Sequence, residues 1–295
     1  MGISPSAFRK SATTAIAAAA ALTLAFATSA AAAQPTVGLG TTDSFAVLAG
    51  SGITNTGATT VSGTAGGDMG SYPNGAFTGD TDVTTTGTKF MAAEAVVGSA
   101  KDDLVTAYDD AAGRTPVTTI SDDLGGKTLK EGVYNSASSL GLTGTLTLDG
   151  ENNPDAVFIF QAGSTLDTAT GSKVALINGA QPCNVFWQVG SSATFGTTTE
   201  FIGHVFALTS ISANNGATFQ GQLLARNGAV TLNHNTIVND LCEDTPVVTP
   251  TPEDTTDTGG ELPNTDTNSW LAPLAIGLSL VAIGFAVFLL RKKRR

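Results

Sequence analysis

Short strands in which apolar residues alternate with threonine and serine fill most of the chain after residue 132. In the segment 142–148, for example, leucines alternate with Thr143, Thr145 and Thr147. Alternation of this kind places one face of a strand on a core and the other face in water. Glycine, asparagine and aspartate mark the turns between strands. The pattern predicts an all-β domain built from many short, one-sided strands.

A loose repeat groups these strands into units of about 20 residues. An apolar strand, a small-residue turn and a Thr-aromatic or Thr-Leu pair recur in VFIFQAGSTL from Val157, VFWQVGSSATF from Val185, FALTSISANNGATF from Phe206 and LLARNGAVTL from Leu223. Units of this length fit the coils of a β-helix, in which each coil is buried only against its neighbours. A β-sandwich is the alternative, because periodicity alone does not separate the two folds.

One segment has helical rather than strand periodicity. Thr88–Ala112 is rich in alanine, its apolar residues recur at helical spacing, and Gly113 follows as a stop signal. We therefore predict a single amphipathic helix over these residues. Adjacent acids on it, Asp102 with Asp103 and Asp109 with Asp110, do not face each other on a helix and are interpreted as a solvated surface.

Several of these segments together resemble the microbial ice-binding protein family. The resemblance rests on SFAVLAGSGITNTGATTVSG from Ser44, SYPNG, the helix, and then GVY, AVFIFQAGSTL, CNVFWQVGSSATFGT, FIGHVFALTSI and LLARNGAVTLNHNTI, and it runs from about Thr36 to Asp240. It implies a discontinuous right-handed β-helix, with one α-helix packed alongside and the N-terminal strands inserted among the C-terminal coils. It also implies a flat β-helix face, poor in charge, that binds ice.

An ice-binding face needs a rigid, uncharged array of hydroxyls and methyls, and the stiff χ1 of threonine suits it. The family's Thr-Ala/Gly-x-Thr/Asn element matches Thr56 to Thr59, which could equally be a turn that serves the fold. We expect Thr194, Thr218 and Thr231 to lie on successive coils near the centre of one face. The other outward candidates are Thr143, Thr145, Thr147, Thr165, Ser192, Ser210, Ser212 and Asn233. Asp167 and Asn214 would interrupt the face, and ordinary β-propensity is the alternative explanation for each threonine.

The N-terminal residues 1–33 read as a secretory signal peptide. Arg9 and Lys10 precede an alanine-rich apolar run, and small residues up to Ala33 suit a signal peptidase. Cleavage near Ala33 would leave Gln34 as the first residue, and an uncleaved anchor is the alternative. The domain would then occupy residues 34–243.

The C-terminal region is organised as a stalk, a motif, an apolar span and a basic tail. Residues 244–261 are rich in Pro, Thr and acids, which favours an extended linker. Residues 270–290 are long and apolar enough to span a bilayer, and the basic residues 291–295 should stay on the cytoplasmic side. The motif before them resembles a Gram-positive cell-wall sorting signal, which would make sortase and peptidoglycan partners. It consists of Leu262, Pro263, Asn264, Thr265 and Asp266.

That resemblance implies that a sortase joins Thr265 to the wall. The family's usual residue after this threonine is glycine, and the chain has Asp266 there. A plain transmembrane anchor is therefore the alternative. In either case we expect the domain to be exported and held at the surface of a Gram-positive cell.

Charge and cysteine content limit the partners of the exported part. The chain has 14 Lys and Arg residues against 25 Asp and Glu residues. Seven of the basic residues lie in the signal region and the tail, so the domain itself is strongly acidic and should not bind nucleic acid. Cys183 and Cys242 are the only cysteines, and an even pair in an exported protein predicts a disulfide.

No motif of an enzyme is present. The chain lacks a Gly-x-Ser-x-Gly elbow, a Walker loop, a His-Glu-x-x-His element and a Cys-x-x-Cys pair, and we expect no catalytic residue, metal or cofactor. The predicted function is therefore surface display of a monomeric ice-binding domain. The alternative is an adhesin or structural wall protein that uses the same scaffold to bind a glycan or another cell.

Overall fold

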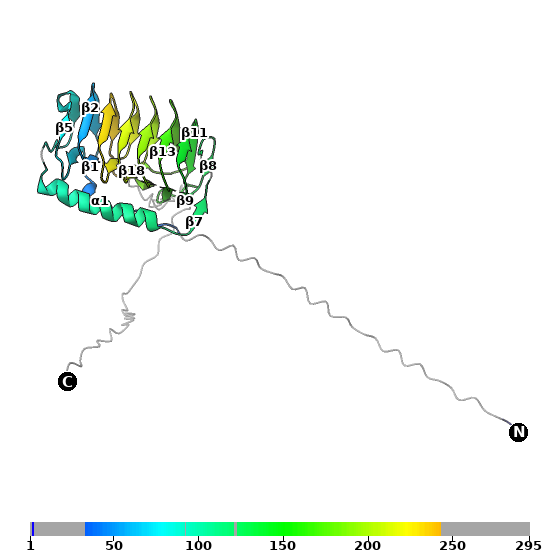
Figure 1. Cartoon of the computed structure of the whole chain (residues 1–295). Helices are drawn as coiled ribbons and strands as arrows, with labels where there is room; N and C mark the ends of the chain where they lie inside the picture. Colours follow the sequence, from blue (N-terminus) through cyan, green and yellow to red (C-terminus); the bar gives the residue numbers. More distant parts are fainter. Residues whose placement is uncertain (1, 3–32, 92, 121–122, 243–295) are drawn as a thin grey trace, which may run out of the picture. The chain divides into compact units, whose positions relative to one another are not determined.

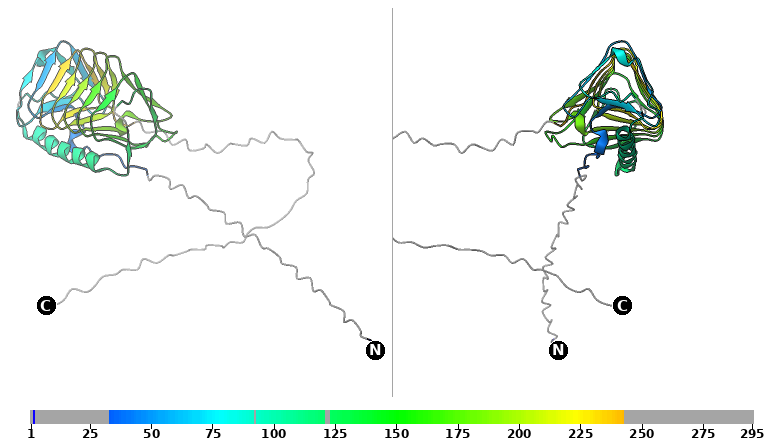
Figure 2. Two further views of the ribbon diagram at one scale, coloured as in Figure 1. Left: turned by 45° about the vertical axis from the view of Figure 1, so that its right-hand side comes forward. Right: turned by 90° about the vertical axis from the view of Figure 1, so that its left-hand side faces the viewer.

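The strands form three parallel sheets that run side by side along a solenoid (Figure 1). The computed structural model describes residues 2, 33–91, 93–120 and 123–242. Seen end on, the solenoid has a roughly triangular section (Figure 2). We call the three sides sheet A, sheet B and sheet C.

Neighbouring strands in each sheet come from successive coils of the solenoid. In spatial order, sheet A contains β4 (Asp68–Ser71), β1 (Phe45–Ala49), β21 (Leu223–Ala225), β18 (His204–Ala207), β15 (Val185–Val189), β12 (Phe158–Ala162), β9 (Gly132–Ser136) and β7 (Val117–Thr119). Sheet B contains β10 (Leu140–Leu142), β13 (Leu166–Thr168), β16 (Ala193–Phe195), β19 (Ile211–Ala213), β22 (Val230–Asn233), β2 (Ile53–Thr56) and β5 (Phe77–Thr78). Sheet C contains β6 (Val83–Thr85), β3 (Thr59–Ser62), β23 (Thr236–Val238), β20 (Thr218–Gln220), β17 (Glu200–Ile202), β14 (Lys173–Ile177), β11 (Thr145–Asp149) and β8 (Thr128–Leu129).

The repeat corresponds to the coils of this solenoid. Its four segments supply β12, β15, β18 and β21, which are successive parallel neighbours in sheet A. Each coil then continues through sheet B and sheet C before it returns to sheet A, as β15, β16 and β17 do. The β-helix prediction is confirmed, and the sandwich alternative is excluded by the parallel ladders.

The order of coils in space differs from their order in the chain. The N-terminal strands β1, β2 and β3 stack on the last C-terminal coil, β21 to β23, with Thr54 paired to Thr231 and Thr60 to Thr236. Strands β4, β5 and β6 stack beyond them. The expected insertion among C-terminal coils is therefore wrong, because these six strands close one end. There they pair the edges that β21 to β23 would otherwise leave open.

The helix connects the two ends of the solenoid. α1 (Ala95–Gly113) follows β6 at one end and precedes β7 at the other. Its 19 residues rise about 28 Å, which covers most of the roughly 34 Å between the two outer strands of an eight-stranded sheet. The prediction placed its start at Thr88, seven residues too early. Lys89 instead forms a β-bridge with Met69, so the backbone there is extended.

The helix packs on the outer face of sheet A (Figure 2). Val97, Ala100, Leu104 and Ala111 are buried against strand residues such as Phe206. The acids of the helix are not merely solvated, as the sequence suggested. Asp103 accepts hydrogen bonds from Thr41, Asp109 pairs with Arg226 at 2.9 Å, and Asp110 pairs with Arg114 at 2.7 Å.

In the described part of the chain, three short 3₁₀ helices lie at turns: η1 (Gly40–Thr42), η2 (Asp80–Asp82) and η3 (Pro182–Asn184). Inside the triangle the core is apolar and partly aromatic. The rings of Phe160 and Trp187 stack with centroids 4.0 Å apart, and Phe195 meets Phe201 edge-on at 4.6 Å. Such stacked rings fix the coils against one another and hold the outer faces rigid.

The disulfide prediction is confirmed. Cys183 of η3 is bonded to Cys242, with 5.4 Å between the two Cα atoms. The strands and the helix of the described residues lie in one compact unit. The stalk, the sorting motif, the span 270–290, the basic tail and nearly all of the signal region lie outside the described residues. Within the described ranges, no helix is long and apolar enough to cross a membrane.

One buried histidine makes the stability of this unit sensitive to acid. His204 is 3% exposed, and its Nδ1 atom lies 2.7 Å from Oε1 of Gln222. Burial lowers the pKa of His204 to about 4 from 6.5. The unfolded chain therefore binds a proton that the folded chain excludes, and the free energy of unfolding should fall by about 3 kcal/mol between pH 6.5 and pH 4.

Thermal unfolding measured across this pH range tests the expectation. His204→Gln retains a hydrogen-bonding group but cannot take up the proton, so its unfolding midpoint should fall less steeply with acidification. His234→Gln, on the exposed surface, is the matched control and should follow the wild type. An identical slope in His204→Gln and the wild type would contradict the assignment.

Candidate functional site

Outward hydroxyls on sheet B stand in register across five strands. Thr194 is paired with Ser212, Ser212 with Thr231, Thr231 with Thr54, and Thr54 with Thr78. We call these five residues the hydroxyl row. With neighbouring strands about 4.8 Å apart, the row extends about 19 Å along the solenoid.

Buried residues on the inner side of sheet B hold the strands of the hydroxyl row rigid. The residues that flank Thr194, Ser212 and Thr231 point inward, and Phe195, Ile211 and Leu232 among them are fully buried. Parallel ladders fix the spacing of the strands, and a β-branched side chain such as threonine keeps a restricted χ1. Thr54, Thr78 and Thr231 are exposed, whereas Thr194 and Ser212 are half-buried.

The hydroxyl row contains no charged side chain, and the first charged residue in register lies beyond its Thr194 end. The next paired position after Thr194 is Asp167, followed by Gly141 and then Asp123. Asp167 accepts a hydrogen bond from Thr165 at 2.5 Å. The uncharged part of the face therefore lies toward the end closed by the N-terminal strands.

The other predicted site residues near sheet B, namely Ser192, Ser210 and Asn233, lie next to the hydroxyl row and form hydrogen bonds at its turns. Ser192 accepts a hydrogen bond from the backbone N–H of Ser210, and Ser210 accepts one from Ala229. Asn233 is paired with Thr56 at the far edge of the sheet, and its Oδ1 atom accepts a bond from Asn215. These side chains lie beside the row rather than within it.

Thr218 does not share a face with Thr194 and Thr231, so the prediction of a single face for the three is wrong. Thr218 lies on β20 of sheet C. Its inward neighbour Phe219 is buried, as expected. The cause is the turn 214–216, which moves the pair Thr218–Phe219 into the next sheet and leaves Ser212 as the true equivalent of Thr194. Thr145 and Thr147 lie on β11 and thus also on sheet C.

Sheet C carries a second outward row, which begins at charged residues and continues through threonines. Its outward row passes through an ion pair in which Lys173 Nζ lies 2.6 Å from Glu200 Oε2. Thr218, Thr236, Thr60 and Thr84 follow in register. A depression of about 450 Å³ lies over this sheet. Sheet B has a similar depression of about 400 Å³ beside Asp123 and Asp167. The two faces therefore differ in the length of the uncharged row, which has five members on sheet B and four on sheet C.

The literal motif Thr56 to Thr59 is a corner rather than a site. Thr56 is exposed at the end of β2, but Thr59 is 1% exposed and accepts a hydrogen bond from the backbone N–H of Asn235 at 3.1 Å. Gly57 has φ 71°, and a Cβ there would collide with the ring of His234. Thr59 therefore does not contact a ligand on the outer face, and the turn interpretation is correct.

Two row members, Thr54 and Thr78, were missed from the sequence. The alternation Ile53–Thr54–Asn55–Thr56 is visible in the chain and indicates an outward Thr54. Its place beside Thr231 is not visible, because it depends on the pairing of strands far apart in the sequence. Among the described residues no cluster of His, Cys, Asp and Glu is arranged to hold a metal ion.

Comparison with known proteins shows that this chain is similar to ice-binding proteins. A 203-residue match to the ice-binding protein of Nostoc sp. (strain HG1) is 45% identical and covers 68% of this chain and 73% of that protein. The match to ice-binding protein 1 of Shewanella frigidimarina is 45% identical but covers only 13% of that longer protein.

Solved structures of ice-binding proteins also match this chain. A crystal structure of an ice-binding protein from an Antarctic biological consortium is 46% identical, with a TM-score of 0.68, and the match covers 71% of this chain and 93% of that one. The structure from Antarctomyces psychrotrophicus is 38% identical, with a TM-score of 0.65, over 71% of this chain and all of that one. Residues 47–238 match the sequence model of the ice-binding-like family, and the chain therefore belongs to that family.

Proposed function

We propose that the domain adsorbs to ice through the outer face of sheet B, with the hydroxyl row at its centre. The observation that carries this proposal is the uncharged register of five hydroxyl side chains on five parallel strands. The relatives and solved structures with the same fold are named as ice-binding proteins. No catalytic role is proposed, and the domain acts as a monomer.

The physical basis is a match between a rigid surface and ordered water. Strand spacing of about 4.8 Å and alternate-residue spacing of about 6.7 Å are of the same order as oxygen repeats on ice planes. Threonine hydroxyls can hydrogen-bond water in this arrangement, and their methyl groups limit other water positions. Little side-chain entropy is lost on binding because the rotamers are already restricted.

Recrystallisation inhibition by the purified domain, residues 34–243, tests the proposal. The expected result is small, stable ice grains after annealing, together with thermal hysteresis. An inactive but folded domain would contradict ice binding and favour the adhesin, which should then be tested against glycans and cells.

The acidic end of the row provides a gain-of-function prediction. Asp167→Thr should lengthen the uncharged row by one strand, because Asp167 is paired directly with Thr194. We expect thermal hysteresis to increase, and Asp155→Thr, at an exposed loop position away from the row, should leave it unchanged. A decrease in Asp167→Thr would show that the carboxylate serves the face.

We also propose that the domain is exported by the signal peptide 1–33 and held at a Gram-positive cell surface by the C-terminal region. Sortase would join Thr265 to peptidoglycan, and the order of motif, apolar span and basic tail supports this. Thr265→Ala should move the protein from the wall fraction to the membrane or the medium. If muramidase releases no ladder of wall-linked wild-type protein, the span 270–290 is the mature anchor instead.

A further inference from the structure

The last described residues show where the chain leaves the folded domain relative to the hydroxyl row. After β23 of sheet C, residues Asn239 to Cys242 run along the corner between sheets C and A. Asn239 donates its backbone N–H to Ser62 at 2.8 Å, and Asp240 accepts one from Thr64 at 2.8 Å. The disulfide then fixes Cys242 to Cys183, which lies in η3, directly before β15 of sheet A.

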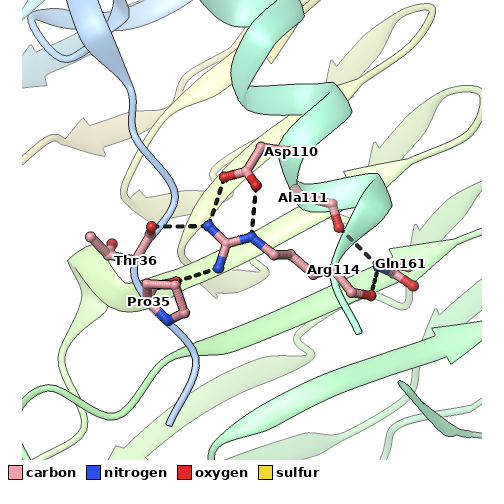
Figure 3. Close-up of polar contacts among 6 residues, drawn as sticks. All are labelled: Pro35, Thr36, Asp110, Ala111, Arg114 and Gln161. Atoms are coloured by element: carbon pink, nitrogen blue, oxygen red, sulfur yellow. Dashed lines mark hydrogen bonds and ion pairs between the residues drawn. The ribbon is translucent and has the colours of Figure 1, made fainter. Parts of the chain in front are cut away.

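The N-terminal arm, residues 33–36, is fixed at the same corner. Arg114, paired with Asp110, donates to the carbonyl oxygens of Pro35 at 2.7 Å and Thr36 at 3.1 Å (Figure 3). The arm and Cys242 line one depression together with Asn153 and Asn184, which belong to connections from sheet C to sheet A. Gln161 holds the adjoining helix end by donating to the carbonyl oxygens of Ala111 and Arg114 (Figure 3).

In a triangular section the corner between sheets C and A is opposite sheet B (Figure 2). Neither the N-terminal residues 33–36 nor residues 239–242 therefore cross the hydroxyl row, and a load applied at Cys242 pulls from the side away from it. The next residues in sequence, 244–261, are the Pro-rich and Thr-rich segment whose composition predicts an extended spacer of about 3 Å per residue.

We propose that this geometry makes the protein a bridge between its cell and ice, in which the tether and the ice face work at the same time. The proposal rests on the proposed function, since it requires sheet B to bind ice. It goes beyond that function because a freely diffusing antifreeze protein needs no particular exit for its ends. The partner pair is an ice crystal on one side and the carrier cell on the other.

Beads that carry the protein in two orientations test the proposal. Residues 34–261 contain every strand and helix of the described residues, together with the stalk segment. One form receives a cysteine after Glu261, and the other carries Asn215→Cys in the turn beside Asn233 and the hydroxyl row. Each is coupled through maleimide-biotin to streptavidin beads, and beads retained on an ice surface under flow are counted. Recrystallisation inhibition by each uncoupled form shows first that it is folded and active.

If the protein acts as a bridge, the ice surface should retain at least tenfold more beads with the C-terminal attachment than with the attachment at residue 215. Equal retention in the two orientations, or no retention with an active uncoupled protein, would overturn the bridge and leave the proposed function intact. Uncoupled proteins that are folded but fail to inhibit recrystallisation would instead refute ice binding itself.

Discussion

Thr231→Lys is expected to abolish ice activity without unfolding the domain. Thr231 is exposed in the middle of the hydroxyl row, between Ser212 and Thr54. A lysine there disrupts the flat surface and brings a hydrated charge that must be stripped of water to approach ice. A cost of a few kcal/mol corresponds to a loss of more than about tenfold. Thermal hysteresis and recrystallisation inhibition measure it.

Thr236→Lys is the matched control for this substitution. Thr236 is also an exposed threonine on a central strand, but it lies on sheet C between Thr218 and Thr60. Both changes should alter stability by no more than about 0.5 kcal/mol, because both positions are exposed. Loss of activity in Thr236→Lys with retention in Thr231→Lys would place the ice site on sheet C.

Removing the disulfide is expected to give the largest loss of stability. The bond joins residues separated by 59 positions, and closure of such a loop contributes about 4 kcal/mol through the entropy of the unfolded chain. For a domain of this size the unfolding midpoint of Cys183→Ser/Cys242→Ser should fall by roughly 10 °C. Differential scanning calorimetry of the double variant and the wild type measures the shift.

The double variant should still fold and bind ice at low temperature. The three sheets have their own buried core, and neither cysteine lies in sheet B. Reduction of the wild type should reproduce the shift, whereas the reductant should not affect the double variant. An unchanged midpoint would mean that the bond serves only to fix the exit of the chain.

The fold class could be predicted from the sequence because it depends on local patterns. Alternation identified one-sided strands, and the repeat identified β12, β15, β18 and β21 as equivalent elements. The order of coils could not be predicted in this way. It depends on the pairing of β1 to β3 with strands more than 170 residues later in the chain, which no local pattern records.

The candidate site was predicted only in part for a related reason. Thr194, Ser212 and Thr231 have inward neighbours that alternate with them, and the structure places them in one row. Thr218 has the same local pattern but lies one corner further along the coil. Sequence alone shows whether a side chain points outward, whereas its sheet depends on where each turn falls. Thr54 and Thr78 join the row only through long-range register.

Direct adsorption to a single ice crystal tests the central claim that sheet B contacts ice. Residues 34–261 and their Thr231→Lys variant each carry a fluorescent label on a cysteine added after Glu261, far in sequence from sheet B. Each protein is then frozen slowly around an ice hemisphere. The account predicts bright, plane-specific fluorescence from the wild type and exclusion of the variant from the ice. Equal incorporation of the two proteins, or exclusion of both while they remain folded, would contradict it.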